Sequence, residues 1–191
     1  GIRQQFGVAL PLAEQVLGGV KRREGFVGRM SAEVLDDADA VGCWHHEQFA
    51  AVLFPTADTL WRVRELSAPT RKLECGRLVI LFNPQWQGEG QVVSDFGFGK
   101  ARRDAEDFVE SFRVTFCLRT LRILGQNVSL YKCYPGPWQL HIVNRFLESE
   151  LLGADLTEPS YRRITELVRR HKERQSVNWL DRVRSGNLWS R

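Results

Sequence analysis

The chain has few of the residues that mark metal knuckles, disulfide scaffolds and membrane spans. Its four cysteines, Cys43, Cys75, Cys117 and Cys133, include no Cys-x-x-Cys pair, and this wide spacing excludes a zinc knuckle and a dense secreted disulfide framework. The longest apolar run, residues 78–82, is far shorter than the roughly 20 residues of a membrane-spanning helix. We therefore expect buried thiols in a reducing compartment and no transmembrane segment.

Methionine is also nearly absent, since the chain begins at Gly1 and its only methionine is Met30. This start favours a removed presequence or a further preceding segment. No internal repeat or low-complexity segment is present. What is present is an ordinary globular composition, with 191 residues of which 43% are hydrophobic and 10% aromatic. A chain of this size and composition can bury one core.

Charge is distributed unevenly along the chain. The net charge is +4, but residues 160–191 carry nine Lys and Arg against three Asp and Glu, which leaves 18 against 20 for residues 1–159. A basic tail of this kind favours an acidic protein surface, an anionic lipid or a nucleic acid as partner. The alternative is a solvated helix face.

Hydrophobic periodicity predicts a mixture of helices and strands in the first half of the chain. Leu12, Val16 and Val20 recur at helical spacing, and Ser31 can cap a second, short helix that ends at Gly42. The predicted elements are helices at 11–24, 31–42 and 56–66 and strands at 49–55 and 76–84. The segment 49–55 also fits the end of a helix. The apolar run 78–82 predicts a strand buried on both faces in the middle of the sheet.

The second half is predicted as a helix, a hairpin and a basic tail. Phe108, Phe112 and Phe116 recur every four residues and predict a long helix that begins at Asp104 and is ended by Gly125-Gln126-Asn127. The predicted strands, 128–134 and 138–143, flank Pro135-Gly136-Pro137, a hairpin turn that places Trp138 in the core. A basic amphipathic helix follows at 157–174.

These elements predict an α/β or α+β fold with a small mixed sheet covered by helices. We expect one domain over residues 1–156. The remaining residues, 157–191, form the basic helix and an aromatic C-terminal tail that is too short to fold alone.

The sequence has partial matches to several chemical motifs. Gly97 to Lys100 resembles the end of a phosphate-binding loop but fails at two of its positions; a weaker anion site built on Lys100, Arg102 and Arg103 stays open. The cluster from Cys43 to Glu47 has adjacent histidines that point apart and no second ligand group, so no metal is expected there. His141 and Cys133 lack an orienting partner for catalysis. No catalytic residue and no cofactor are predicted.

Three segments in succession carry a resemblance: "VLFP" at 52–55, "LVILFNPQWQ" at 78–87, and "FVESFRVTFCLRTL" followed by "LYKCYPGPWQLHIV". Their order resembles a plant, algal and cyanobacterial family of domains of unknown function that includes the photosystem II assembly factor Low PSII Accumulation three. The resemblance spans roughly residues 49–143 and implies a chloroplast stromal setting, peripheral to the thylakoid membrane, rather than an active site. The residues that match its motifs, which we interpret as fold determinants, are Asn83, Pro84, Tyr134, Pro135, Gly136 and Trp138.

The leading hypothesis is therefore a non-enzymatic plastid protein that binds a photosystem or another thylakoid complex, as an assembly factor or a linker subunit. Peripheral contact with the membrane surface is compatible with it, and nucleic acid is the less favoured partner because no RNA-binding motif is present. The residues expected to bind the partner are Arg162, Arg163, Arg169, Arg170, Lys172, Trp179, Leu188 and Trp189. The competing hypothesis is a nucleotide- or phosphate-binding regulator or enzyme of the stroma.

Overall fold

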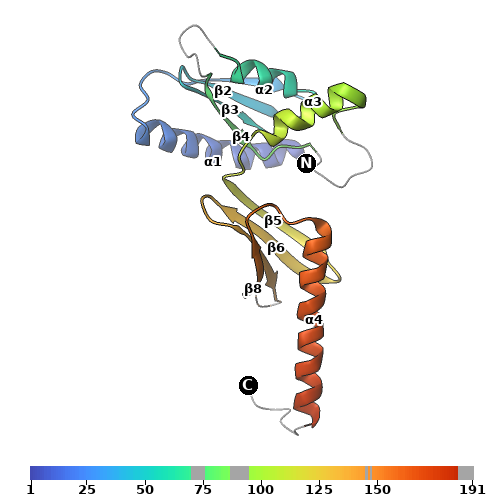
Figure 1. Cartoon of the computed structure of the whole chain (residues 1–191). Helices are drawn as coiled ribbons and strands as arrows, with labels where there is room; N and C mark the ends of the chain where they lie inside the picture. Colours follow the sequence, from blue (N-terminus) through green and yellow to red (C-terminus); the bar gives the residue numbers. More distant parts are fainter. Residues whose placement is uncertain (70–75, 87–94, 145, 147, 185–191) are drawn as a thin grey trace. The chain divides into compact units, whose positions relative to one another are not determined.

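The computed structural model describes residues 1–69, 76–86, 95–144, 146 and 148–184, with side chains up to residue 176. Contacts divide the chain into two compact units, Gly1–Val109 and Glu110–Arg191. Each unit has a four-stranded sheet of its own, as Figure 1 shows. The fold is of the α+β class, as predicted. From the sequence we predicted one domain over residues 1–156 and a separate tail over 157–191. The contacts instead divide the chain after Val109, so the C-terminal helix belongs to the same unit as the strands that precede it.

The first unit is built on a mixed sheet. Its elements are α1 (Ile2–Arg23), β1 (Ser31–Asp36), β2 (Val41–His45), β3 (Phe49–Leu53), α2 (Leu60–Ser67), β4 (Leu78–Phe82) and α3 (Gly99–Glu110). The strands lie in the order β1-β2-β3-β4. The pairs β1–β2 and β2–β3 are antiparallel, and β3–β4 is parallel. The predicted strands 49–55 and 76–84 and the helix 56–66 are confirmed.

Helix α1 covers one face of this sheet. Its buried residues Ala13 and Leu17 pack against Trp44 and Phe49, among others. The amphipathic helix predicted at 11–24 is therefore present but starts earlier, at Ile2. The predicted apolar stripe is on the wrong side, because Leu12 is 59% exposed. Leu17, five positions further on, lies on the face that packs.

Helix α2 lies on the opposite face from α1, as Figure 1 shows, and buries Leu60, Val63 and Leu66. It connects the two parallel strands, β3 and β4, as a helix normally does in a parallel pair. Strand β3 is buried throughout, whereas β4 is the last strand of the sheet and is half-buried or exposed. The prediction that residues 78–82 lie in the middle of the sheet is wrong.

Residues 31–36 form the edge strand β1 rather than the predicted helix at 31–42. Most of β1 is exposed, so the strand has little apolar alternation to reveal it. It is a strand because it pairs with β2, which is buried except at His45, and its own sequence does not indicate this pairing. At its end, the Asp36 carboxylate accepts hydrogen bonds from the backbone N–H groups of Ala38 and Asp39 and closes the turn into β2.

The second unit is an antiparallel sheet packed by one helix. Its elements are β5 (Phe116–Ile123), β6 (Gln126–Cys133), β7 (Trp138–Val143), β8 (Ser149–Asp155) and α4 (Tyr161–Arg184). The strands pair in sequence order. Every second residue of β7, Trp138, Leu140 and Ile142, is buried and packs with Ile164 and Val168 of α4. The predicted hairpin and the core position of Trp138 are confirmed.

The prediction of one long helix from Asp104 to the Gly125-Gln126-Asn127 stop is wrong. Helix α3 ends at Glu110, and Phe116 begins strand β5. A spacing of four residues between phenylalanines fits a helix, but four is also a multiple of the two-residue period of a strand. Phe108 therefore belongs to the helix and Phe116 to the strand.

Among the described residues, no helix combines the length and the apolar character that a membrane span requires.

Candidate partner-binding surface

Helix α4 carries the predicted basic surface, and its first half is part of the second unit's core. Ile164, Val168 and His171 are buried and lie at intervals of four and three residues, which places them on one face of a helix. The His171 ring accepts a hydrogen bond from the side-chain amide of Gln175 and lies 3.6 Å from a carboxylate oxygen of Glu150 on β8. The predicted division of this helix into an apolar side and a basic side is confirmed.

The approach of α4 to the sheet depends on a glycine in β8. A Cβ atom at Gly153 would lie 3.0 Å from a methyl group of Leu167, which is tighter than ordinary van der Waals contact. Leu167 packs against the core of the second unit. Glycine at this position therefore lets the helix lie close to the strand.

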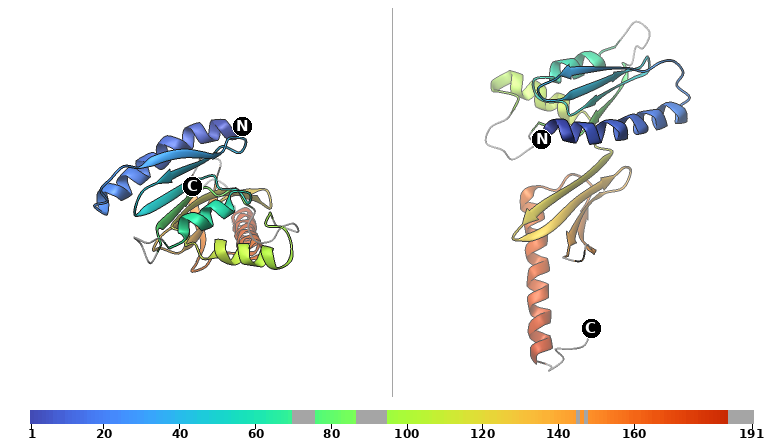
Figure 2. Two further views of the ribbon diagram at one scale, coloured as in Figure 1. Left: turned by 90° about the horizontal axis from the view of Figure 1, so that it is seen from above. Right: turned by 180° about the vertical axis from the view of Figure 1, so that it is seen from behind.

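After His171 the helix leaves the sheet. Residues 172–176 are all exposed, and the helix continues to Arg184. Figures 1 and 2 show this C-terminal half of α4 extending past the ends of the strands of the same unit. Thirteen residues beyond His171 correspond to about 20 Å at 1.5 Å per residue. An isolated helix of this length is marginal in water, so the extension is suited to packing against another molecule.

The arginines of α4 differ in how strongly they are held. Arg163 is half-buried and lies 3.4 Å from an oxygen of Asp155 and 3.9 Å from one of Glu166. Arg170 forms an ion pair with Glu166. These two predicted binding residues are therefore already engaged within the unit.

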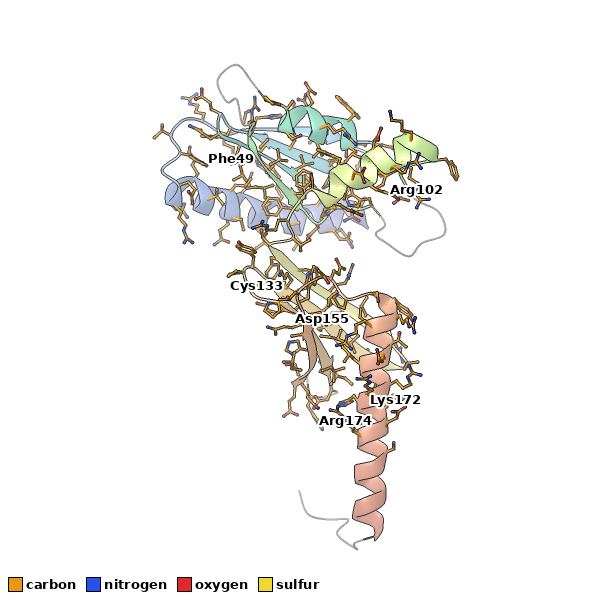
Figure 3. All side chains as sticks on the ribbon, in the orientation of Figure 1. Phe49, Arg102, Cys133, Asp155, Lys172 and Arg174 are labelled. Carbon is orange, nitrogen blue, oxygen red and sulfur yellow. The ribbon has the colours of Figure 1, made fainter. Side chains whose placement is uncertain are left out.

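Arg162 and Arg169 are exposed, and among the described residues neither has an acidic partner. Lys172 is exposed and donates a hydrogen bond to the Leu124 carbonyl at 3.3 Å. It lines a shallow hollow together with Leu124, Arg169, Glu173 and Ser176. Figure 3 shows Lys172 and Arg174 on this helix. These side chains form the cationic surface that remains open to a partner.

The aromatic part of the predicted surface lies outside the described side chains. Trp179 is within α4, but only its place in the helix is described, and Leu188 and Trp189 lie outside the described residues. Their predicted roles stay predictions.

The structure shows a second exposed surface that the sequence did not predict, on the face of the sheet opposite α4. Phe116 and Leu118 of β5 are 63% and 64% exposed. They lie opposite Cys133 and Tyr131 in the β5–β6 register, and the Phe116 and Tyr131 rings are in edge-to-face contact. This surface was missed because residues 116–121 were assigned to a helix. The alternation of Phe116, Leu118 and Thr120 with Cys117, Arg119 and Leu121 was the signal for it.

Most of the residues that match the family motifs lie in turns, and Trp138 begins strand β7. Phe54 and Asn83 both adopt positive φ, each directly before a proline that follows a strand. The two turns are joined, since the Phe54 N–H donates to the Phe82 carbonyl and the Gln85 N–H to the Pro55 carbonyl, each at 2.8 Å. Asn83 and Pro84 therefore end β4 where it is tied to the end of β3, as expected of fold determinants.

The second motif forms the β6–β7 turn. Tyr134-Pro135 is a cis peptide bond, and the Gly136 N–H donates to the Cys133 carbonyl at 2.8 Å. A Cβ atom on Gly136 would lie 3.0 Å from the same carbonyl oxygen, so the tight turn favours glycine. Tyr134 is half exposed and accepts a hydrogen bond from Arg113 at 3.0 Å.

The candidate anion site lies at the start of α3. Lys100 and Arg103 are exposed there, but Arg102 donates a hydrogen bond to Glu106 at 2.8 Å. Figure 3 shows Arg102 on this helix. Most of the preceding segment, residues 87–94, lies outside the described residues. Of the three predicted anion ligands, one is therefore paired within its own helix.

The histidines of the Cys43–Glu47 cluster point to opposite faces of the first sheet, as predicted. His46 is buried and stacks on Phe49 at 4.8 Å between ring centroids. His45 lies on the other face, beside Cys43 and Glu33. Burial raises the pKa of the Cys43 thiol to about 12. The hydrogen bonds from His45 and Arg62 lower the pKa of the Glu33 carboxyl.

The thiols of three cysteines can be placed: Cys43 is buried, Cys117 is half-buried and Cys133 is exposed, and all three are free. Cys75 lies outside the described residues. The prediction of free thiols is confirmed for these three, but Cys133 is not buried as expected. Cys133 and His141 are not neighbours, because His141 pairs with Ser129, four residues before Cys133 on β6. That spacing is about 13 Å along a strand.

Comparison with known proteins gives one match. A family model described as "Domain of unknown function (DUF1995)" matches residues 4–166. No curated protein matches the chain. No solved structure matches it either.

Proposed function

The chain belongs to the DUF1995 family, a domain of unknown function, and from this premise we propose that it is a non-enzymatic plastid protein that binds a photosynthetic membrane complex. It binds at the stromal side, as a peripheral linker subunit or an assembly factor. The family resemblance in the sequence supports the plastid setting. The observation that carries the binding role is the exposed basic side of α4, formed by Arg162, Arg169, Lys172 and Arg174, on a helix that continues beyond the sheet of its own unit.

The electrostatics of α4 support a negatively charged partner surface. Arg162 and Arg169 are exposed and lack an acidic partner among the described residues, and Lys172 and Arg174 are exposed on the next turns. Near an anionic membrane surface each Lys or Arg contributes about 1 kcal/mol. Binding of α4 to a complex at such a surface is therefore strengthened by the charges of the helix and by packing of its C-terminal end against the partner. The attraction falls with added salt, because the Debye length shortens.

The experiment is co-sedimentation of the purified chain with thylakoid membranes. Changing Arg162, Arg169 and Arg174 to glutamate together is expected to abolish most of the bound fraction at moderate salt. Deleting residues 177–191 from the otherwise unchanged chain is also expected to reduce the bound fraction, because most of the extension of α4 is lost.

The matched control changes three cations of α1, Arg3, Arg22 and Arg23, to glutamate. These residues are exposed on the first unit, and the substitution alters the net charge by the same amount. It is expected to leave the bound fraction close to that of the wild type. Equal loss in both variants means that net charge and not α4 drives binding, and no loss in the α4 variant removes this helix from the proposal.

The rival function, a nucleotide-binding regulator, is tested on the same protein. Calorimetric titration with adenine nucleotides is expected to give no binding heat, since Arg102 is engaged with Glu106. A saturable binding curve that is lost in Lys100→Ala would favour the nucleotide-binding regulator over the proposed binding of a membrane complex.

A further inference from the structure

Two neighbouring strands of the first unit bring three different metal-ligating side chains together. Cys43 and His45 are two residues apart on β2 and so share a face of the sheet. Glu33 lies directly opposite Cys43 on β1. The ligand atoms of the three, Sγ, Nε2 and Oε1, all lie within 4.8 Å of one another. Sequence reasoning had Cys43 and His45 but not Glu33, because residues 31–42 were predicted to be a helix.

One nitrogen atom is shared in this cluster. His45 Nε2 lies 3.3 Å from Cys43 Sγ and 2.7 Å from Glu33 Oε1. A ring nitrogen carries either one proton or one lone pair, so it cannot donate to the carboxylate and accept from the thiol at the same time. When Nε2–H donates to the carboxylate, the thiol is left with only weak hydrogen bonds: its sulfur shares that N–H as a weak acceptor, and its own proton has the Trp44 carbonyl at 4.0 Å. A cation between the three atoms would satisfy all of them.

We propose that Glu33, Cys43 and His45 bind a single zinc ion, with the fourth position open to water. This site is separate from the proposed function, since the three ligands belong to the first unit and the partner-binding helix to the second. Zinc prefers thiolate, imidazole and carboxylate ligands in a tetrahedral arrangement, and three protein ligands with one open position are typical of its reactive sites.

The distances suit such an ion. Zinc–ligand bonds of about 2.0–2.3 Å place the ligand atoms of a tetrahedron about 3.3–3.7 Å apart. The Sγ–Nε2 separation of 3.3 Å lies in this range, and the Nε2–Oε1 separation of 2.7 Å must widen by about half an ångström. The third pair, Sγ and Oε1, lies within 4.8 Å and must close by up to about 1 Å. Glu33 can move, because it lies on an edge strand with its side chain 44% exposed.

The three ligands differ in their exposure to solvent. Cys43 is buried within the sheet, whereas the His45 and Glu33 side chains reach solvent. An ion held by these atoms would therefore have protein on the thiolate side and water on the other. The open position faces the solvent side, where a water molecule or a small ligand can enter.

Arg62 of α2 positions the carboxylate. Its guanidinium lies 3.0 Å from Glu33 Oε1 and 2.6 Å from an oxygen of Glu65. Carboxylates that bind metals are commonly hydrogen-bonded in turn, which fixes their orientation. The Glu65 carboxylate offsets the arginine charge, so the surroundings of the cluster stay suitable for a cation.

The test is zinc binding by the full chain, stripped with a chelator and kept in a thiol-free reductant. Competition with a chromophoric chelator is expected to give one zinc per chain with a Kd of about 1 µM or below. His45→Gln and Glu33→Gln are each expected to weaken binding by at least about 10-fold. The cobalt-substituted protein is expected to show a thiolate-to-cobalt charge-transfer band, which Cys43→Ser removes.

Matched controls separate this site from other ligands of the chain. His141→Gln and a variant with Cys75, Cys117 and Cys133 all changed to Ser are expected to bind zinc as the wild type does. Because Cys43 is buried, Cys43→Ser can fail to fold, and the two partly exposed ligands keep the test decisive. A smaller loss than 10-fold in both His45→Gln and Glu33→Gln, or a cobalt spectrum without the thiolate band, overturns the proposal.

Discussion

The two units differ in how completely their sheets are covered. In the first, α1 packs on one face and α2 on the other, and strands β2 and β3 are buried almost throughout. In the second, α4 packs on one face, and Phe116 and Leu118 are exposed on the opposite one. The first sheet is an internal layer, and the second is a one-sided sheet.

This difference indicates a division of roles. A sheet with both faces covered can hold side chains in fixed positions, as it does for Cys43 and His45. An extended helix is a feature of surfaces that bind other molecules, and it belongs to the second unit, whereas exposed apolar side chains occur in both units, since Val8 and Leu12 of α1 are 69% and 59% exposed. The covered strands of the first unit therefore suit the proposed zinc site, and the extended helix of the second unit suits the proposed partner contact.

Two phenylalanines on strands give the largest expected contrast. Phe49 of β3 is fully buried, whereas Phe116 of β5 is 63% exposed. Phe49→Ala is expected to lower the free energy of unfolding by about 3–5 kcal/mol, from lost burial and the cavity left behind. Phe116→Ala is expected to lower it by less than about 1 kcal/mol. Urea unfolding followed by circular dichroism measures both, and similar losses would mean that the outer face of the second sheet is covered after all.

The same comparison can be made within α4, between its packed and extended halves. Val168 has no exposed surface, and Val168→Ala is expected to cost about 1.5–3 kcal/mol of unfolding free energy. Arg174, in the exposed part, is expected to change stability by less than about 0.5 kcal/mol when replaced by alanine. Thermal unfolding of the two variants is the measurement. Equal effects would show that the helix is packed along its whole length.

The sequence predicted best the elements whose own pattern is decisive. Strand β7 alternates buried and half-buried residues, and the turn before it contains the proline and glycine that fix its shape. The first half of α4 has its apolar residues at helical spacing. In these segments the local pattern and the packing agree, so the period of the sequence is sufficient.

The wrong predictions concern strands whose structure depends on pairing with a neighbouring strand. Strand β1 is polar and exposed, and it is a strand because β2 offers a ladder of backbone groups. Strand β4 is apolar, yet it is the last strand of the sheet, since it pairs with β3 and with no other strand of the described residues. Neither fact is contained in the local pattern. Of the three proposed zinc ligands, Glu33 is brought to Cys43 by the β1–β2 register, so it was missed for the same reason.

The buried thiol of the first unit predicts an alkaline loss of stability. Burial raises the pKa of Cys43 from 9.0 to about 12, so the folded protein holds the proton that the unfolded chain releases above pH 9. This contribution is complete below pH 9 and is lost as the pH rises toward 12. At pH 10 the metal-free protein is expected to be about 1.4 kcal/mol less stable than at pH 8 through this group.

Cys43→Ala is the control for this pH effect. Urea unfolding at the two pH values, with a chelator present, is expected to show a difference smaller by about 1.4 kcal/mol than in the wild type. The alanine variant is less stable overall because it leaves a small cavity, but that cost is independent of pH. An unchanged difference would show that the thiol is not held neutral by burial.

The smallest contrast compares one surface ion pair from each unit. Glu166 precedes Arg170 by four residues on α4, whereas Glu106 follows Arg102 by four on α3. Glutamate on the N-terminal side is the more favourable order, because it matches the helix dipole. Glu166→Gln is expected to cost about 0.3–0.5 kcal/mol and Glu106→Gln less. Both losses should vanish in urea titrations at 1 M salt, where charges separated by solvent are screened beyond about 3 Å. A larger loss for Glu106→Gln would mean that this carboxylate has a role in its unit beyond pairing with Arg102.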